Sequence, residues 1–185
     1  MLVYSASKVQ NEKDIKNSNK NYVILRLGSV YGYSSTDTMR INIMPNLFSK
    51  IASQNGSISL FSGGKQIKSL VPLIDVVRCM KFMAENNKVT KETFNLVKDS
   101  VTVKEVAEIC KKYNPKTSII ITDDETPNPG YTLSNKKLLS SGFKFFYSLE
   151  ESIFTMIKQW SYKQSDHDLE YKTRGEKEFI DKEVK

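Results

Sequence analysis

Residues 22–32 read Tyr22-Val-Ile-Leu-Arg-Leu-Gly-Ser-Val-Tyr-Gly32 and carry the strongest structural signal in the chain. Apart from Arg26, the first six residues are apolar or β-branched, as in a strand buried in a parallel sheet. Gly28 and Gly32 then bracket a predicted turn. On a strand, Arg26 is twice as easily explained as a structural residue that bridges two layers as by contact with a ligand. The segment therefore predicts a buried strand over residues 22–27 that ends in a loop.

Helical and strand patterns alternate along the rest of the chain, without a detectable internal repeat. The predicted helices are 5–18, 41–54, a helix opened by Asp75, 103–113, 135–140 and 149–162. The predicted strands and apolar runs are 22–27, 57–61, 67–73, 93–97 and 118–122. This alternation is typical of the α/β class. From residue 161 the composition becomes charged and loses its periodicity, which predicts frayed helix or disorder.

Several local features can be predicted at the ends and faces of these elements. Thr102 with Glu105 has the spacing of a capping box, and Gly63-Gly64 need be no more than a hairpin turn. Asp75 is equally compatible with a helix N-cap and with a functional acid. The inward faces are expected to be Val76, Met80, Met83 and Ala84 in one helix and Ile153, Phe154, Ile157 and Trp160 in another.

Composition excludes several chemistries. His167 is the only histidine, and Cys79 and Cys110 are the only cysteines, among 185 residues. These are too few ligands for a structural Cys/His zinc site and leave little for a Ser-His-Asp triad, so no metal site is predicted. Separated cysteines outside a C-x-x-C pair suit buried thiols in a reducing compartment. No apolar run approaches the roughly 18 residues that cross a bilayer, so we expect a cytoplasmic protein without membrane contact.

The net charge of +7 invites a nucleic-acid hypothesis, but the charges are scattered. Residues 161–185 carry 6 Lys/Arg and 7 Asp/Glu, which leaves this tail at −1 and the rest of the chain at +8. The lysines form no run and have no stacking aromatics at a regular spacing. We therefore expect a solvated lysine-rich surface and no nucleic-acid partner, although an anionic small-molecule ligand would also fit.

The candidate chemistry lies at Tyr4-Ser5-Ala6-Ser7-Lys8. On a helix, side chains at i and i+4 lie on one face about 6 Å apart, so the Lys8 ammonium would lie beside the Tyr4 phenol. A nearby cation lowers a phenol pKa toward neutral pH, as a tyrosine acid/base requires. A chain this rich in Tyr and Lys would also contain such a pair by chance. On spacing alone, an ordinary surface pair is the better explanation.

Further motifs follow the pair in a fixed order, and together they resemble the extended short-chain dehydrogenase/reductases, the NAD-dependent epimerase/dehydratase family that modifies nucleotide sugars. The resemblance runs over residues 1 to about 162 and covers the C-terminal half of that family. It is carried by Tyr4-x-x-Ser7-Lys8, Glu12, Arg26-Leu27-Gly28-Ser29-Val30-Tyr31-Gly32, the stretch Leu60 to Val76, Phe94-Asn95-Leu96-Val97, Val101 to Val106, Ser134 to Leu138, Gly142-Phe143 and Ser148-Leu149-Glu150-Glu151.

The resemblance implies a role for several of these residues. Tyr4 would be the catalytic acid/base that exchanges a proton with a sugar hydroxyl while hydride passes to or from the nicotinamide of NAD or NADP. Lys8 would hold the nicotinamide ribose and depress the pKa of Tyr4. Gly28, Ser29 and Val30 would border the nicotinamide, although Ser29 stands where many members have Asn, which puts an amide contact there in doubt.

Two further residues are candidates for the nucleotide-sugar substrate. Lys68 stands where many members place an Arg on the substrate diphosphate, and lysine neutralises a phosphate without the bidentate fork of arginine. Asn42, expected at a helix start, could face the sugar or the nucleotide.

The family binds its dinucleotide chiefly through an N-terminal Gly-x-x-Gly-x-x-Gly turn, and no three of the eight glycines satisfy that spacing. The Ser or Thr that usually precedes the family's tyrosine by some two dozen residues has no counterpart before Tyr4. We therefore expect the C-terminal part of a Rossmann-type parallel sheet plus a smaller α/β substrate-binding domain, with the dinucleotide-binding half absent.

The predicted organisation is a remnant of the NAD-binding domain at 1–33, a mainly substrate-binding domain at 34–162 and a charged tail at 163–185. Two functions are compatible with it. The chain is either part of an NAD(P)-dependent nucleotide-sugar epimerase, dehydratase or reductase, homodimeric when complete, or a redox-inactive nucleotide-sugar binding or interaction module. The strand at 22–27 is expected to leave an unpaired edge that promotes association.

Overall fold

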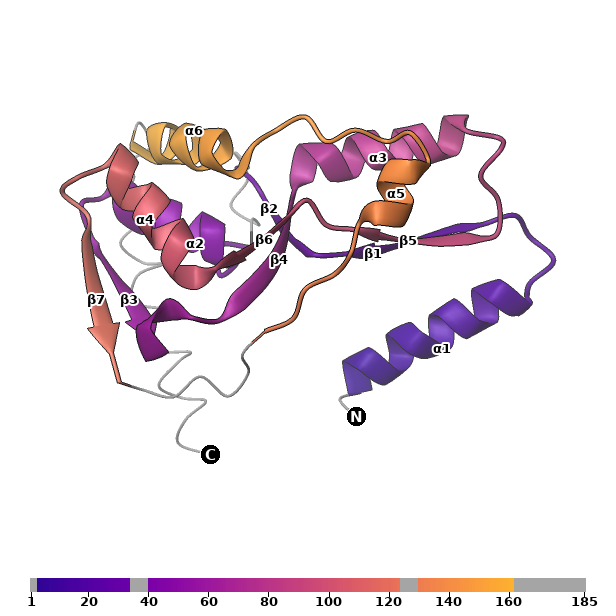
Figure 1. The fold of residues 1–185 in the computed structure, drawn as a ribbon, viewed down its shortest axis with the longest axis horizontal. Coiled ribbons are helices and arrows are strands. Elements are labelled where there is room, and N and C mark those ends of the chain that lie inside the picture. The colour runs from indigo at the N-terminus through magenta and orange to yellow at the C-terminus, as the bar shows by residue number, and fades with distance from the viewer. Residues whose placement is uncertain (1–2, 34–39, 124–129, 162–185) are drawn as a thin grey trace.

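The structure, a computed structural model, describes residues 3–33, 40–123 and 130–161. It confirms the α/β class (Figure 1). The helices are α1 (Val3–Asn17), α2 (Met44–Ser53), α3 (Leu73–Glu85), α4 (Val103–Tyr113), α5 (Lys136–Ser140) and α6 (Leu149–Ser161), with a 3-10 turn η1 at Ser62–Gly64. The strands are β1 (Val23–Leu27), β2 (Ser29–Tyr31), β3 (Ser57–Phe61), β4 (Ile67–Pro72), β5 (Glu92–Leu96), β6 (Asp99–Thr102) and β7 (Ser118–Thr122). The predicted tail at 163–185 lies outside the described residues.

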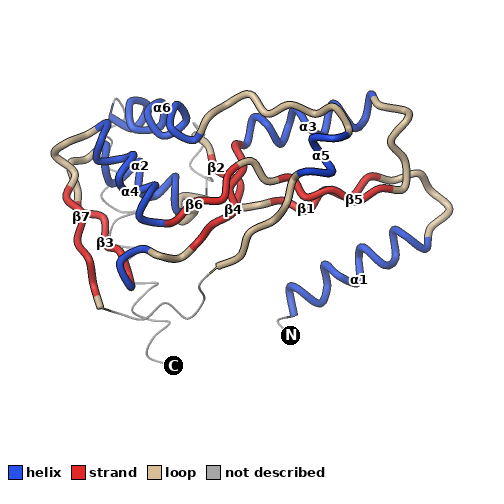
Figure 2. The backbone as a smooth tube through the Cα atoms, in the orientation of Figure 1, coloured by secondary structure: helices blue, strands red, loops and turns tan. Residues whose placement is uncertain are grey.

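The strands pair mainly in parallel, as expected for this class. Figure 2 shows the paired strands side by side along the molecule. β1 pairs with β5, β2 with β4, and β3 with β7, all in parallel, whereas β6 runs antiparallel to β4. Parallel strands need crossover connections, which the intervening helices supply. Within the described ranges, β1 has β5 as its partner on one edge, and no strand pairs with its other edge.

The predicted turn between Gly28 and Gly32 is wrong, because residues 29–31 form β2. The Gly28 N–H still donates to the carbonyl of Leu96, the last residue of β5, at 3.1 Å. The next residue, Ser29, pairs with Leu70 on β4. The chain therefore changes its neighbouring strand at Gly28 without turning back.

Two apolar cores lie at opposite ends of the molecule (Figure 1). The core beneath α3, here called the α3 core, comprises Val71, Val76, Cys79, Met83, Phe94, Leu96, Leu138 and Phe143. The core beneath α6, here called the α6 core, comprises Tyr31, Phe48, Ala52, Ile58, Leu60, Leu70, Val106, Ala107, Cys110, Leu149, Ile153, Met156, Ile157 and Trp160. The β2–β4–β6 sheet joins the two, since Leu70 belongs to one core and Val71 to the other.

Burial differs from the prediction on β1 and α3. Along β1 only Ile24 is buried, so this strand is not the fully buried one that its composition suggests. On α3 the buried apolar face contains Cys79 with Val76 and Met83, whereas Met80 and Ala84 are exposed. Both corrections concern one region of the molecule, where apolar side chains of α3 and β1 face outward.

Helix boundaries follow local chemistry more closely. The helix predicted at 41–54 begins at Met44, because Pro45 occupies its first turn and fixes the entry of the chain. The capping box of α4 is confirmed, with Thr102 Oγ1 accepting from the Glu105 N–H at 3.2 Å and Glu105 Oε2 accepting from the Thr102 N–H at 2.6 Å. On α6, Phe154 is 37% exposed, whereas the other three predicted inward residues are buried.

Gly63 and Gly64 do not form a hairpin turn. They lie in η1, and the strands on either side of it, β3 and β4, belong to different sheets. Gly64 has φ +69°, and an added Cβ there would lie 2.9 Å from the Lys104 nitrogen, so glycine is required by both conformation and space. No helix among the described residues is long and apolar enough to cross a membrane.

Candidate functional site

Tyr4 and Lys8 lie together on the first two turns of α1, as their spacing predicts. The Lys8 Nζ is 5.4 Å from the centre of the Tyr4 ring. Tyr4 is 72% exposed, and α1 buries none of its described side chains. A phenol beside an ammonium on an open helix is accessible to a ligand, while the role of either group in proton transfer stays a prediction.

A bidentate ion pair ties α1 to the sheet. Arg26 on β1 donates to Glu12 through Nε at 2.8 Å and through Nη2 at 2.6 Å. The hydrogen bond from Arg26 is the main cause that lowers the pKa of the Glu12 carboxyl. Arg26 therefore bridges two layers, as the structural interpretation of its sequence position predicts. Figure 1 shows that α1 runs opposite to β1, so its first turn points toward the carboxyl end of that strand.

Gly28 marks the carboxyl end of β1, where the chain changes from β5 to β4. A Cβ at this position would lie 2.7 Å from the Ser69 carbonyl oxygen and 3.0 Å from Val97 Cγ2. Contacts this short exclude any side chain, so the glycine is explained by the close approach of two backbones. Ligands of open α/β sheets bind outside the carboxyl ends of the strands, and Gly28 lies at that end of β1.

The residues after Gly28 become steadily more buried along β2. Ser29 is exposed, Val30 is half-buried and Tyr31 is 1% exposed. Burial raises the pKa of the Tyr31 phenol, so this tyrosine stays neutral and belongs to the α6 core. Ser29 and Val30 are therefore the two β2 residues whose side chains are accessible near the end of β1. Their contact with the nicotinamide stays a prediction.

Asn46, which sequence reasoning missed, binds two backbone groups between β2 and α2, one at Gly32 and one at Arg40. Its Oδ1 accepts the Gly32 N–H at 3.0 Å, and its Nδ2 donates to the Arg40 carbonyl at 3.3 Å. The Asn46 side chain is 4% exposed, and both bonds are partly buried. Asn42, the predicted substrate residue, is exposed in the turn before α2, where it does not start the helix. A polar residue just after Pro45 in an apolar helix was the available signal for Asn46.

Lys68 lies half-buried on β4, opposite Val101 on β6. Its neighbour Ser69 is buried and donates its hydroxyl to the Tyr131 carbonyl at 3.0 Å. The structure places Lys68 in the sheet that carries β2, while Asn42 lies in a separate turn. The predicted phosphate role of Lys68 stays a prediction.

Asp75 is not an N-cap. The N-cap of α3 is Pro72, and the Asp75 carboxylate, which is 0% exposed, accepts the backbone N–H groups of Phe146 and Tyr147. Asp75 also pairs with Arg78 one turn later. The carboxylate therefore binds a distant segment of the chain, which a sequence pattern on α3 could not reveal.

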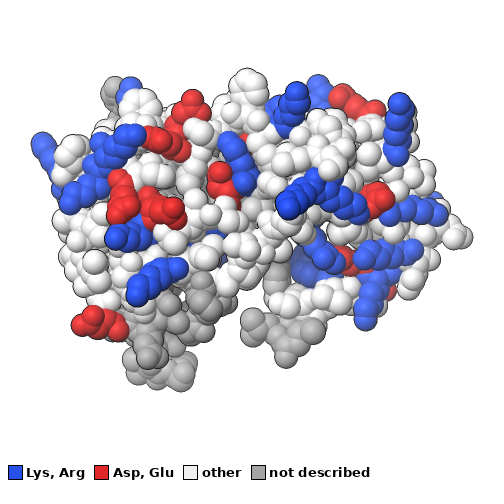
Figure 3. All heavy atoms as spheres, viewed as in Figure 1, with Lys and Arg blue, Asp and Glu red and all other residues white. Residues whose placement is uncertain are grey.

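The two thiols have no reactive surroundings. Burial raises the pKa of Cys79 to about 11 and that of Cys110 to about 12. Within the part of the chain that the structure describes, no three His, Cys, Asp or Glu side chains gather closely enough to hold a metal ion. Figure 3 shows lysine and arginine side chains dispersed among acidic ones over the visible face, without a continuous basic patch.

Comparison with known proteins identifies the family. The sequence model described as NAD dependent epimerase/dehydratase family matches residues 2–96, which include α1, the β1–β2 segment and α3. The chain belongs to this family. A dihydroflavonol 4-reductase from Callistephus chinensis is 32% identical over 111 residues, which are 58% of this chain and 29% of that protein.

Solved structures of family enzymes share the fold. The UDP-glucose 4-epimerase of Thermotoga maritima, solved with UDP-glucose, has a TM-score of 0.69 at 18% identity and covers 83% of this chain and 50% of its own. The dTDP-glucose 4,6-dehydratase of Bacillus anthracis, solved with NAD, has a TM-score of 0.71 at 17% identity and covers 89% and 53%. The chain thus spans about half the length of these enzymes.

Proposed function

We propose that this chain is the substrate-binding part of an NAD(P)-dependent nucleotide-sugar epimerase, dehydratase or reductase, with Tyr4 as its acid/base. The observation that carries the proposal is the adjacency of Tyr4 and Lys8 on α1, a helix tied through Glu12 and Arg26 to the strand that ends at the change of pairing order. Membership of the epimerase/dehydratase family supports it.

The chain's own residues would move one proton. Tyr4 as phenolate would take the proton of a sugar hydroxyl when the adjacent carbon is oxidised, and would return it when the carbonyl is reduced. The Lys8 ammonium would favour the phenolate by its charge. A bound nicotinamide would supply the hydride chemistry.

The residues present fit one part of the dinucleotide. Ser29 and Val30 offer surface at the carboxyl end of β1, and Lys8 offers a donor for ribose hydroxyls, which suits the nicotinamide end. Lys68 would neutralise one phosphate of the nucleotide sugar as a point charge. The dinucleotide phosphates themselves need a glycine-rich turn, which these residues do not provide.

An open surface on β1 and α3 indicates where the dinucleotide-binding part would pack. Leu73, Val77 and Met80 form an exposed apolar stripe on α3, at 46, 54 and 52% exposure. Beside it lies a groove of about 420 Å³ lined by Val23, Leu25, Met80, Met83 and Ala84. The groove adjoins the edge of β1 that has no strand partner in the described ranges.

The topology indicates one occupant for this surface. Since α1 leads into β1, a right-handed crossover would come from a parallel strand beside β1, and β5 already occupies the other edge. A parallel strand would satisfy the open edge, and another helix of the same half would cover the stripe on α3. We take that strand and helix to belong to the dinucleotide-binding half, with residues 1–33 as its last part and 34–162 mainly for substrate. Homodimerisation of the complete enzyme belongs to the same proposal.

The acid/base assignment is tested by Tyr4→Phe in the complete enzyme, that is, this chain joined to its dinucleotide-binding half. Turnover of a nucleotide sugar should fall by at least about 100-fold, the lower range for a lost acid/base group, while NAD affinity stays unchanged. Tyr22→Phe, just before β1, is the matched control and should keep activity. Near-normal turnover of the Tyr4 variant would refute the assignment.

The alternative, a redox-inactive nucleotide-sugar module, predicts a different binding pattern. Calorimetry of the chain by itself with UDP-glucose and with NAD gives the starting point for both functions. In both cases the chain should show no measurable NAD affinity. If adding a dinucleotide-binding half produces neither NAD binding nor turnover while nucleotide-sugar binding persists, the module is the correct function.

A further inference from the structure

One short segment connects the two apolar cores on the side of α3 and α6. Residues 143–148, here called the strap, lie between α5 and α6 and end just before Leu149, the first residue of α6. Phe143 at its start belongs to the α3 core, and Leu149 just after it belongs to the α6 core. The strap therefore links the α3 core directly to the α6 core.

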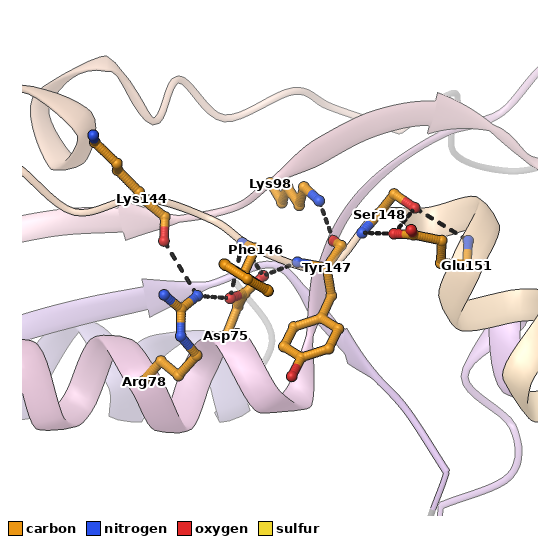
Figure 4. Close-up of polar contacts among 8 residues, drawn as sticks. All are labelled: Asp75, Arg78, Lys98, Lys144, Phe146, Tyr147, Ser148 and Glu151. Carbon is orange, nitrogen blue, oxygen red and sulfur yellow. Dashed lines mark hydrogen bonds and ion pairs between the residues drawn. The ribbon is translucent and has the colours of Figure 1, made fainter.

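Charged side chains bind both backbone polar groups, the N–H and the carbonyl, of a single strap residue, Tyr147 (Figure 4). Its N–H donates to Asp75 Oδ2 at 3.3 Å, and its carbonyl accepts from Lys98 Nζ. Asp75 lies on α3, and Lys98 lies in the short connection between β5 and β6. Hydrogen bonds to charged groups are about twice as strong as neutral ones, and Asp75 is fully buried.

Neighbouring contacts reinforce this attachment. The Phe146 N–H donates to both Asp75 oxygens at 3.2 Å. Arg78 pairs with Asp75 and donates to the Lys144 carbonyl at 3.2 Å. The Arg78 guanidinium also lies 5.2 Å from the centre of the Phe146 ring. The buried Asp75 charge is thus balanced by Arg78 and fully engaged with the strap.

The strap passes directly into α6 through a reciprocal cap. Glu151 Oε2 accepts the Ser148 N–H at 3.2 Å, and Ser148 Oγ accepts the Glu151 N–H at 3.1 Å (Figure 4). Such a cap fixes the entry direction of a helix. Because the residue before Ser148 is the one that Asp75 and Lys98 hold, the start of α6 is fixed relative to α3.

The contacts of α6 continue through α2 to the candidate site. α6 packs on α2, which carries Asn46, and Asn46 accepts the Gly32 N–H that follows β2. β2 in turn begins at Ser29, one of the residues proposed to border the nicotinamide. A closed ring of contacts thus runs from α3 through the strap, α6 and α2 to the end of β2.

We propose that Asp75 and Lys98 are positioning residues. By binding the backbone N–H and the carbonyl of Tyr147, they set the orientation of the α6 core relative to the α3 core. This rests on the proposed function in one respect: the orientation would align the substrate side with Tyr4. The physical claim concerns the two cores alone and holds for any function of the site.

The first readout is amide hydrogen exchange at Phe146 and Tyr147. Asp75→Asn keeps the shape but removes the charge, and Lys98→Met removes the carbonyl's partner. Loss of a charge-assisted bond should speed exchange of these amides about tenfold or more in Asp75→Asn. Glu92→Gln is the matched control. It also replaces a carboxylate by an amide, but in the ion pair with Lys137, which does not involve the strap.

The second readout is the distance between the cores, measured by pulsed electron spin resonance. Spin labels are attached to cysteines that replace Glu85 on α3 and Lys111 on α4. Both positions are exposed. Cys79 and Cys110 are buried and should not take label. The distance distribution should broaden in Asp75→Asn and Lys98→Met and stay narrow in Glu92→Gln and in Lys98→Arg, which keeps the donor.

The outcomes are decisive in either direction. If Asp75→Asn does not fold, Lys98→Met and Lys98→Arg carry the test, because Lys98 is half-exposed and its loss leaves no charge fully buried. Faster exchange without a broader distribution would reduce the contacts to a local anchor and overturn the proposal, as would unchanged exchange. No substrate or cofactor is used, so failure here is distinct from failure of the proposed function.

Discussion

Arg26 on β1 and Glu12 on α1 form a two-point ion pair, with nitrogen to oxygen distances of 2.8 and 2.6 Å. The pair joins the helix that carries Tyr4 to the strand that ends at Gly28. Since α1 buries none of its described side chains, this polar contact has an unusual share in holding the helix. The placement of the proposed acid/base group therefore depends on it.

Arg26→Met should loosen α1 without unfolding the protein. The Arg26 side chain is 53% exposed, so we expect a loss of global stability of about 1 kcal/mol or less. Amide exchange along α1 should nevertheless become faster. Lys16→Met is the control, because Lys16 also pairs with Glu12, at 3.7 Å, but within the helix. Equal exchange rates in the two variants would contradict a special role for Arg26.

Gly28→Ala should destabilise the fold. The new methyl group would lie 2.7 Å from the Ser69 carbonyl oxygen, a backbone atom that cannot move by itself. Overpacking of this kind costs about 1 to 3 kcal/mol, which urea unfolding would measure. The neighbouring exposed Ser29→Ala should be nearly neutral. A neutral Gly28→Ala would show that β1 and β4 are less closely packed than described.

Asp99 should make stability fall as pH rises above about 4, which is near the ordinary aspartate value. Burial raises the pKa of the Asp99 carboxyl, and its Oδ2 has no hydrogen-bond partner among the described residues. Between the unfolded and the raised native pKa, the native state holds a proton that the unfolded state has lost, so stability decreases with pH. Asp99→Asn removes this contribution.

The comparison of Asp99→Asn with the unsubstituted chain isolates the effect. Several glutamates with lowered pKa act in the opposite direction, including Glu12 and Glu105, but they are common to both proteins. Urea unfolding from pH 4 to 7 should show that the variant gains stability relative to the parent as pH rises. Parallel curves would exclude a raised Asp99 pKa.

Both cysteines should resist thiol reagents at pH 8 in the native state and react fully in denaturant. Burial holds the pKa of Cys79 near 11 and that of Cys110 near 12, so neither forms the reactive thiolate. Because the unfolded thiols ionise first, stability should also fall with rising pH above about 8.5. Rapid labelling of native protein would contradict their burial.

Val77→Lys should weaken association through the open face of α3. Val77 is 54% exposed within the apolar stripe, and a charge there opposes burial by the proposed dinucleotide-binding half. Analytical ultracentrifugation of the chain, with and without that half, would measure the effect on complex formation and on self-association. Ile121→Lys on β7, at 63% exposure, is the control. Equal effects of the two changes would argue against this surface.

Local sequence signals predicted the elements well where a short-range rule governs them. The Thr102 and Glu105 cap of α4 needs only residues three apart, so its spacing was sufficient. The adjacency of Tyr4 and Lys8 follows from helix geometry in the same way. The predicted start of α2 was three residues too early. The apolar periodicity begins before Pro45, which lies in the first turn of the helix.

Long-range pairing was not predictable from the same signals. The β2 strand was taken as a turn because its glycines favour one locally, and only β4, some forty residues later, shows why Gly28 is needed. Asp75 had the position of a cap, yet its partners at 146 and 147 lie about seventy residues away. Met80 and Ala84 on α3 were likewise predicted to face inward but are exposed, since periodicity shows that a face is apolar and not what covers it.

By itself, the sequence determined the α/β class, the helix that places Lys8 beside Tyr4, and the cap of α4, because each depends on contacts within a turn or on the period of one element. Only the tertiary structure decided that Arg26 binds Glu12, that Gly28 lies against the Ser69 carbonyl, and that Asp75 and Lys98 hold Tyr147. Those contacts join residues far apart in the chain, and their energies depend on burial and distances that no local pattern contains.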